Sequence, residues 1–222
     1  MEDKDKATAF KDFCDAARHA LQKESDRLLD ITLHRLKTEE SRWHPNGFAV
    51  FHVDDHHKLG QLRLHIWPDS PRVLRPDAPP IHSHVWHLCS QVLVGRYSET
   101  LFEEIQSPDV GVQEYQSADI DYLVDRNSFG PIKRSQLRPT SVVSVSAGQL
   151  HVVEAGIPHE TQIQPDTFVA TLMIASRPEM QSATVYSDSQ ITSSSYERPT
   201  VTQEEKFTML DKLNQELSRP AA

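Results

Sequence analysis

The sequence predicts an all-β fold with helices at both ends, and two patterns support this prediction. Between Phe48 and Ile174, short apolar runs alternate with turn residues, as is typical of an antiparallel sandwich or barrel. Before and after this region, apolar residues recur at the spacing of an amphipathic helix. With 222 residues, the chain has a length at which all-β folds often form a single domain.

The N-terminal region favours helical structure. Residues 7–43 contain no Pro or Gly, and their apolar side chains recur at roughly helical spacing among charged residues. We expect one long amphipathic helix or two shorter ones, within an N-terminal segment of residues 1–45 that packs on the barrel. The sequence His44-Pro45-Asn46-Gly47 ends the pattern, because a residue before Pro avoids the helical region and Asn-Gly favours a turn.

The central region, residues 46–178, is predicted to form the barrel. Its expected strands are residues 48–53, 61–67, 85–94, 97–102, 141–146, 150–153 and 168–174. On the second of these strands, Arg63, His65 and Trp67 share one face, and the other face is aliphatic. The polar face either lines a cavity or is exposed to solvent.

The C-terminal region, residues 179–222, is expected to belong to the same domain. Residues 177–199 are rich in Ser and Thr without periodicity, which indicates a surface loop or an arm wrapped around the barrel. Thr202 and Glu205 then match a helix N-cap and first turn. The apolar stripe of the following helix is expected to consist of Phe207, Leu210, Leu213 and Leu217.

Composition argues against several classes of partner. Lys and Arg number 23 against 32 Asp and Glu, a net charge of -9, so an acidic surface would repel nucleic-acid phosphates. The two cysteines, Cys14 and Cys89, are far apart and indicate a reducing compartment rather than a disulfide framework. The N-terminus does not resemble a signal peptide, and no apolar run approaches the roughly 20 residues that cross a bilayer. We expect a soluble cytoplasmic protein that binds neither nucleic acid nor membrane.

Two short motifs predict a metal site. His82 and His84 are one residue apart, and on a strand their side chains would project from the same face and reach one metal ion. The strand that follows them ends at Gly95. The second motif, Gly156-Ile157-Pro158-His159, places a turn Gly shortly before another His.

Together these residues resemble the two-part signature of the cupin superfamily, which implies a double-stranded β-helix jelly roll. The resemblance implies that His82, His84 and His159 are metal ligands, with His151 as the rival for the third position. The Glu that usually completes the signature falls on Leu88. Three neutral imidazoles would leave a bound ion its full divalent charge and open coordination positions.

Within the cupins, the chain is similar to the thiol dioxygenase branch, represented by cysteine dioxygenase. The likeness includes residues 98–102 and 171–178. At the positions of that family's Ser, His and Tyr relay, this chain retains one hydroxyl, that of Thr171. The family's carboxylate-binding Arg has no counterpart at residues 51–54, and Arg63 on the next strand is the candidate for its role.

The resemblance implies a non-haem iron(II) oxygenase that acts with dioxygen on a small metal-chelating substrate, a thiol or a small acid. Zinc, nickel, copper and manganese have overlapping ligand preferences and remain open. The alternatives are a non-redox isomerase or lyase that uses its metal as a Lewis acid, and a non-catalytic cupin that binds a small molecule. The family likeness also favours a homodimer.

Other reactive side chains are expected to have ordinary structural roles. By strand alternation, His87 and Cys89 should point away from the metal face. The histidines at positions 52, 56 and 57, near Asp54 and Asp55, predict a hydrated loop. Glu103-Glu104 predicts a solvated face.

Overall fold

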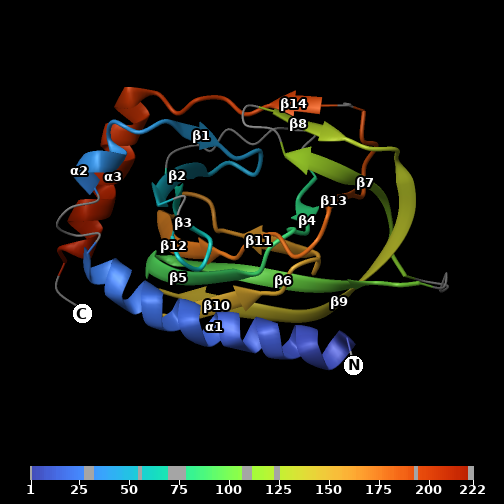
Figure 1. Ribbon diagram of the computed structural model, residues 1–222. Helices are drawn as coiled ribbons and strands as arrows, with labels where there is room; N and C mark the ends of the chain where they lie inside the picture. The colour runs from blue at the N-terminus through green and yellow to red at the C-terminus, as the bar shows by residue number, and fades with distance from the viewer. Residues whose placement is uncertain are drawn as a thin grey trace.

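Two antiparallel β-sheets form the body of the molecule in the computed structural model (Figure 1). The structure describes residues 2–27, 33–54, 57–69, 79–106, 112–122, 126–192 and 195–219. Helices lie outside the sheets, at the left and along the bottom of the view (Figure 1). The prediction of an all-β jelly roll with flanking N-terminal and C-terminal helices is confirmed.

The first sheet has six strands in the order β1-β2-β3-β12-β5-β10. They are β1 (Ser41–Trp43), β2 (Ala49–Asp54), β3 (Gln61–Trp67), β12 (Val169–Ala175), β5 (Leu88–Val94) and β10 (Leu150–Val153). Strand β12 pairs with β3 on one side and β5 on the other, so a late segment of the chain lies at the centre of the sheet.

The second sheet has eight strands in the order β13-β4-β11-β6-β9-β7-β8-β14. They are β13 (Ala183–Ser187), β4 (Ile81–His82), β11 (His159–Gln162), β6 (Arg96–Glu104), β9 (Lys133–Ser146), β7 (Glu114–Tyr122), β8 (Arg126–Phe129) and β14 (Ser195–Glu197). Strand β13 also pairs with β7, which closes a ring of strands and leaves β13 no free edge there.

The strands with clear apolar patterns are those that the sequence predicts best. The predictions for residues 61–67 and 150–153 match β3 and β10 to the residue. The predicted strand 85–94 begins only at Leu88, and residues 141–146 are the end of the longer β9.

Two predictions about chain segments are wrong. Residues 41–43, expected in the N-terminal helix, form β1, because pairing with β2 opposes Ser41 to Phe51 and Trp43 to Ala49. The segment 177–199, expected as a loop or arm, contains β13 and β14. In β13 the residues Ala183, Val185 and Tyr186 are buried, so tertiary pairing overrides the Ser- and Thr-rich composition.

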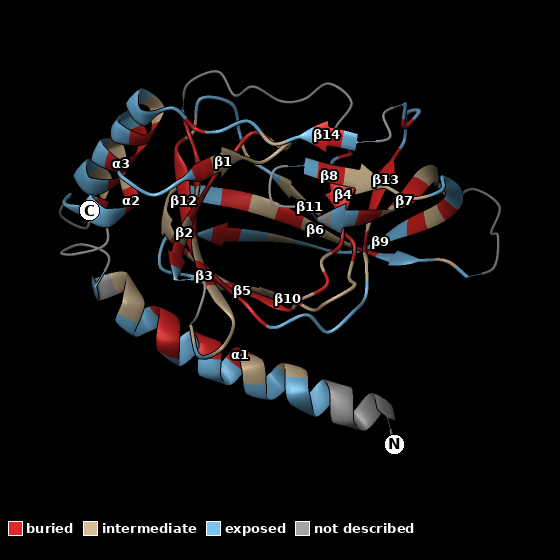
Figure 2. Cartoon of the chain, turned by 45° about the horizontal axis from the view of Figure 1, so that its top comes forward, coloured by how far each residue is buried: buried red, intermediate tan, exposed pale blue. Residues whose placement is uncertain are grey.

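The described part of the N-terminal region is helical up to Leu36, as predicted. Helix α1 (Glu2–Arg27) runs along the outside of the first sheet, with Ala17 and Leu21 fully buried against it (Figure 2). Helix α2 (Leu33–Leu36) follows, and the intervening residues 28–32 lie outside the described ranges. In the described part of the chain, no helix is both long enough and apolar enough to span a membrane.

The C-terminal helix α3 (Gln203–Leu217) begins at the predicted capping box. The Thr202 hydroxyl accepts a hydrogen bond from the Glu205 N–H, and the Glu205 carboxylate accepts one from the Thr202 N–H. The prediction that Phe207 belongs to the buried face of this helix is wrong. Phe207 is 47% exposed, and the Lys37 ammonium lies 5.1 Å from its ring centroid. Lys206 turns inward in its place and donates to the Glu39 carbonyl.

The first sheet separates the main hydrophobic core from a cavity. The aliphatic residues of β3, Leu62, Leu64 and Ile66, belong to the core that the helices cover. The opposite face of β3 lines a cavity between the sheets. Of the two interpretations of this polar face, the structure therefore supports the cavity lining.

Replacing Gly95 by Ala is expected to destabilise the fold strongly. Gly95 joins β5 to β6 with φ of +78°, and a Cβ atom there would lie 2.4 Å from the Phe168 carbonyl oxygen. Gly148 has a similar φ of +82° but open space around it, so Gly148→Ala is the matched control. We expect a loss in the free energy of unfolding of about 1 kcal/mol for Gly148→Ala and at least about 3 kcal/mol for Gly95→Ala, measured by urea denaturation. Equal losses would contradict a specific role for the close contact.

Candidate metal centre

The three predicted metal ligands converge at one point. His82 on β4 is paired directly with His159 on β11. Their ring centroids are 4.7 Å apart, and the His84 ring lies 4.8 Å from His82 and 5.0 Å from His159. One possible ligand atom of each residue lies within 4.8 Å of the others, as a shared metal ion requires.

The convergence combines cross-strand pairing with the spacing of the first motif. Strand β4 ends at His82, so His84 lies just beyond the assigned strand rather than on it. The Ser83 N–H between the two histidines still donates to the Thr184 carbonyl, and the bend of the chain follows His84, at residues 85–86.

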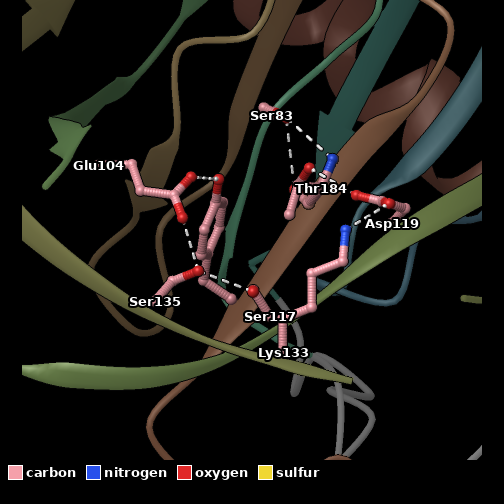
Figure 3. A network of polar contacts seen from close by, with 8 residues as sticks. Ser83, Glu104, Ser117, Asp119, Lys133, Ser135 and Thr184 are labelled. Carbon is pink, nitrogen blue, oxygen red and sulfur yellow. Dashed lines mark hydrogen bonds and ion pairs between the residues drawn. The ribbon is translucent and has the colours of Figure 1, made fainter. Parts of the chain in front are cut away.

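Ser83 holds the segment between the two histidines in place (Figure 3). Its N–H donates to the Thr184 carbonyl over 2.8 Å, and its hydroxyl accepts from the Thr184 N–H over 2.9 Å. The Thr184 hydroxyl donates to Asp119, whose other carboxylate oxygen accepts from Lys133. The segment is therefore tied to β13.

The same view shows that Glu104 does not face only solvent (Figure 3). Its carboxylate accepts hydrogen bonds from the hydroxyls of Ser135, at 2.6 Å, and Tyr186, at 3.1 Å. Glu103 and Glu104 are both exposed, in agreement with the predicted solvated face, and Glu103 pairs with Arg138.

The histidine rings have the protonation state that metal binding needs. His82 Nδ1 lies 3.3 Å from the Pro80 carbonyl, and His159 Nδ1 lies 3.1 Å from the Ile157 carbonyl. A carbonyl only accepts, so each Nδ1 carries the hydrogen and each Nε2 keeps its lone pair. Burial lowers the pKa of His82 to about 3 and that of His159 to about 4. Both rings are thus neutral at neutral pH.

His84 also fits a metal ligand. Burial is the main cause of a pKa well below the usual histidine value, with further lowering from His82 and His159. Its Nδ1 is buried and has no hydrogen-bond partner among the described residues. A buried polar nitrogen without a partner is costly, and the chemistry of the three donors suits a divalent ion.

The rival ligand His151 does not join this group. It lies on β10, paired with Ser90, and its ring faces Tyr97 at 6.3 Å. It lines the same cavity but stands apart from the three converging rings. The structure therefore brings His159, rather than His151, to the His82 and His84 pair.

Both predicted catalytic residues line the cavity, which has a volume of about 660 Å³. The Arg63 guanidinium lies 5.2 Å from the Trp86 ring centroid and donates to the Gln61 side chain. Thr171 on β12 is buried on the cavity side of the sheet. Leu88, at the position of the missing Glu, also lines this space.

The histidine-rich segment after residue 51 is divided between two environments. His52 lies on β2 and lines the cavity, so its prediction as a loop residue is wrong. His57 lies in a turn and accepts from the Leu59 N–H. Residues 55 and 56 are outside the described ranges, and within those ranges the His82, His84 and His159 group is the one cluster with metal-ligand spacing.

His87 and Cys89 face away from the site, as predicted. His87 packs against Phe10 and Phe13, with ring centroids 4.9 and 5.7 Å away, and accepts from the Ala155 N–H. Cys89 is fully buried in the core, and burial raises the pKa of its thiol to about 12. Neither side chain is available for chemistry in the cavity.

Sequence reasoning missed Glu99. This residue lies on β6 with 3% of its surface exposed, and its Oε1 is 3.8 Å from His159 Nε2. Its Oε2 accepts a hydrogen bond from the Thr161 hydroxyl over 2.7 Å. Burial raises the pKa of this carboxyl to about 7. Alternation could have found it, because Glu99 shares the strand face of Tyr97, which the apolar pattern places inside.

Comparison with known proteins gives only distant similarities. No family model matches the chain, and no curated protein sequence matches it. Solved structures to which it is similar include hydroxypropylphosphonic acid epoxidase from S. wedmorenis, with 12% identity, coverage of 66% of this chain and 55% of that chain, and a TM-score of 0.35. The Drosophila melanogaster CENP-C cupin domain has 12% identity, coverage of 70% and 98%, and a TM-score of 0.36.

An oxalate oxidase structure is similar at 15% identity, with coverage of 65% of this chain and 53% of that chain and a TM-score of 0.32. The chain spans about half the length of the epoxidase and oxidase chains that it matches. Similarity at these scores supports no conclusion about activity, so the metal centre rests on this chain's own residues.

Replacing His159 by Ala is expected to lower the affinity for a divalent metal at least about a hundredfold, because one of the converging donors is lost. His151→Ala is the matched control, since it removes a histidine from the same cavity but not from the converging group. Titration of zinc into chelator-treated protein measures both. The assignment is wrong if His151→Ala loses the metal and His159→Ala keeps it.

The fold is expected to lose stability in mild acid partly through His65. Burial is the main cause that lowers the pKa of His65 to about 3 from the ordinary 6.5. Below pH 6.5 the unfolded chain binds a proton that the folded chain does not, so stability falls as pH decreases, by up to about 2 kcal/mol at pH 5. His65→Gln should reduce the difference in urea-unfolding free energy between pH 7.5 and pH 5, measured with a chelator present. If the unfolding free energies of the parent chain and His65→Gln fell equally between pH 7.5 and pH 5, His65 would not be a cause of the acid sensitivity.

Proposed function

We propose that this chain is a metal-dependent oxygenase of the cupin type. In this proposal His82, His84 and His159 hold a divalent ion, expected to be iron(II), beside the site of a small substrate. The observation that supports it is the convergence of three neutral imidazoles, two buried and that of His84 half-buried, on the wall of a cavity of about 660 Å³. Cavities that bind small molecules typically measure roughly 300–1,000 Å³.

The donor set suits a substrate that binds through a thiolate or a carboxylate. Iron(II), when bound, would supply the redox chemistry toward dioxygen. Three neutral imidazoles add no negative charge, so an anionic substrate group is attracted to the same point. His82 and His159 are buried in the cavity wall, and the low polarity of buried surroundings strengthens this attraction.

Arg63 is the proposed anchor for a substrate carboxylate. Its guanidinium stays charged at any physiological pH and can bind a carboxylate through two parallel hydrogen bonds. Contact with the Trp86 ring and with Gln61 restricts its orientation within the cavity. A substrate held at Arg63 at one end and at the histidines at the other would have its reactive group fixed.

Thr171 is proposed to orient the substrate through its single hydroxyl. It lies next to Met173 on the cavity side of β12, where the thiol dioxygenase relay would have more polar groups. One hydroxyl can donate one hydrogen bond and accept others, so Thr171 can position a substrate oxygen or sulfur. Substrate and dioxygen are the partners of this site.

Oxygen consumption by the iron-loaded protein tests the proposal. Candidate thiols and small acids are first added without oxygen, and then oxygen uptake is measured after mixing with air-saturated buffer. We expect substrate-dependent uptake that His82→Ala abolishes. Product formed equally well under nitrogen would identify Lewis-acid chemistry instead, and a protein that binds small molecules but purifies without metal would identify a non-catalytic binder.

The matched control for the substrate site is Arg63→Gln. It removes the charge but leaves the three imidazoles in place, so metal content should be unchanged while the KM for an acidic substrate rises at least about tenfold. An unchanged KM would exclude Arg63 as the carboxylate anchor.

A further inference from the structure

Two further arginines of the described residues line the cavity together with Arg63. Arg42 on β1 forms an ion pair with Glu40 over 2.5 Å and donates to the Arg198 carbonyl over 2.9 Å. The second contact ties the segment after β14, which carries Arg198, to β1. The C-terminal part of the chain thus contributes a cationic side chain to the candidate substrate site, although Arg198 is far from Arg63 in sequence.

Arg63 and Arg198 act on the same ring, that of His65. Burial is the main cause that lowers the pKa of His65, and the positive charges of Arg63 and then Arg198 lower this pKa further. The remaining cause is His52, so none of the described acidic groups is among these causes. Because the effect of a charge falls with distance, both guanidiniums lie near His65. This part of the cavity wall is therefore positive, in a chain whose net charge is -9.

Two neutral rings add hydrogen-bonding groups to the same wall. The Phe48 ring contacts both, with centroids 4.2 Å from His44 and 5.0 Å from His65. Burial is the main cause of a pKa of His44 well below the usual value, and its Nδ1 accepts from the Asn46 N–H, so Nε2 carries the hydrogen. Within the described ranges, the buried Nε2 of His65 has no hydrogen-bond partner. With the hydrogen on Nε2, it can donate to an oxygen of a bound anion.

This set of donors suits an anionic group with two charges and several oxygens. A guanidinium can bind two oxygens at once through parallel hydrogen bonds. A carboxylate has two oxygens and one charge, whereas a phosphate monoester has three terminal oxygens and a charge of about -1.5 to -2 at pH 7. Two guanidiniums therefore favour the phosphate group both in charge and in the number of hydrogen bonds.

We propose that Arg63 and Arg198 together bind a phosphate group of the substrate, with His44 and His65 as additional donors to its oxygens. The inference rests on the proposed function, because it narrows the acidic group expected at Arg63 to a phosphate monoester. The other end of the substrate reaches the three converging histidines. Arg198 is then a residue that determines specificity, since Arg63 alone is sufficient for a carboxylate.

Binding of inorganic phosphate to the metal-free chain tests the site without any measurement of activity. The metal is removed with a chelator, and the chelator is then removed, because phosphate would also bind a metal ion. Calorimetry measures the affinities for phosphate and for acetate. We expect phosphate to bind at least about tenfold more tightly than acetate, and Arg198→Gln to weaken phosphate binding at least about tenfold but acetate binding less than about threefold. Arg138→Gln, exposed and paired with Glu103, is the matched control and should bind phosphate as the parent chain does.

A second variant separates the loss of anion binding from a loss of fold. Arg198→Lys keeps the positive charge but not the planar pair of donors, so its phosphate affinity should lie between those of the parent chain and Arg198→Gln. Urea unfolding without phosphate compares the stability of the variants.

Two results would overturn the inference while the metal site of the proposed function stands. One is Arg198→Gln with the parent's phosphate affinity, and the other is a parent chain that binds acetate or the dicarboxylate malonate as tightly as phosphate. A chain that binds phosphate through Arg198 but binds neither iron nor cobalt would contradict the proposed function and leave the anion site in place.

Discussion

The direct pairing of His82 with His159 across β4 and β11 is the constraint on which the candidate metal centre depends. Opposed residues of antiparallel strands bring their Cβ atoms to about 5 Å, close enough for two imidazoles to approach one ion. Because side chains alternate along a strand, a shift of one residue would turn either ring to the opposite face. The centre is therefore specified by sheet register, and Ser83 then fixes where the chain continues toward His84.

The first sheet connects the site to the rest of the fold, because one face packs in the hydrophobic core and the other face lines the cavity. Strand β12 is buried on both faces, with Leu172 and Ile174 in the core and Thr171 and Met173 at the cavity. The helices cover the core face of the first sheet (Figure 2). Residues that contact substrate on such strands are positioned more exactly than residues on loops.

Sequence reasoning recovers those features that have a local pattern. The alternating β3 was predicted to the residue, and the two short motifs identified the three histidines that converge. Strand β7 was missed because its sequence is mostly polar, and its place comes from pairing with β9 and β13. Glu99 was missed for a similar reason, since its burial is created by the pairing of β6 with the distant β11.

The closure of the second sheet has a consequence for how the protein is synthesised. Strand β4 lies between β11 and β13, and both neighbours are encoded far downstream of it. During translation, His82 and His84 leave the ribosome long before the segment 183–187 that flanks them. The nascent chain therefore cannot assemble this centre early, and contacts of such long sequence separation form slowly. A metal ion held by this candidate centre would be bound only after the segment 183–187 has been synthesised and the ring of strands has closed.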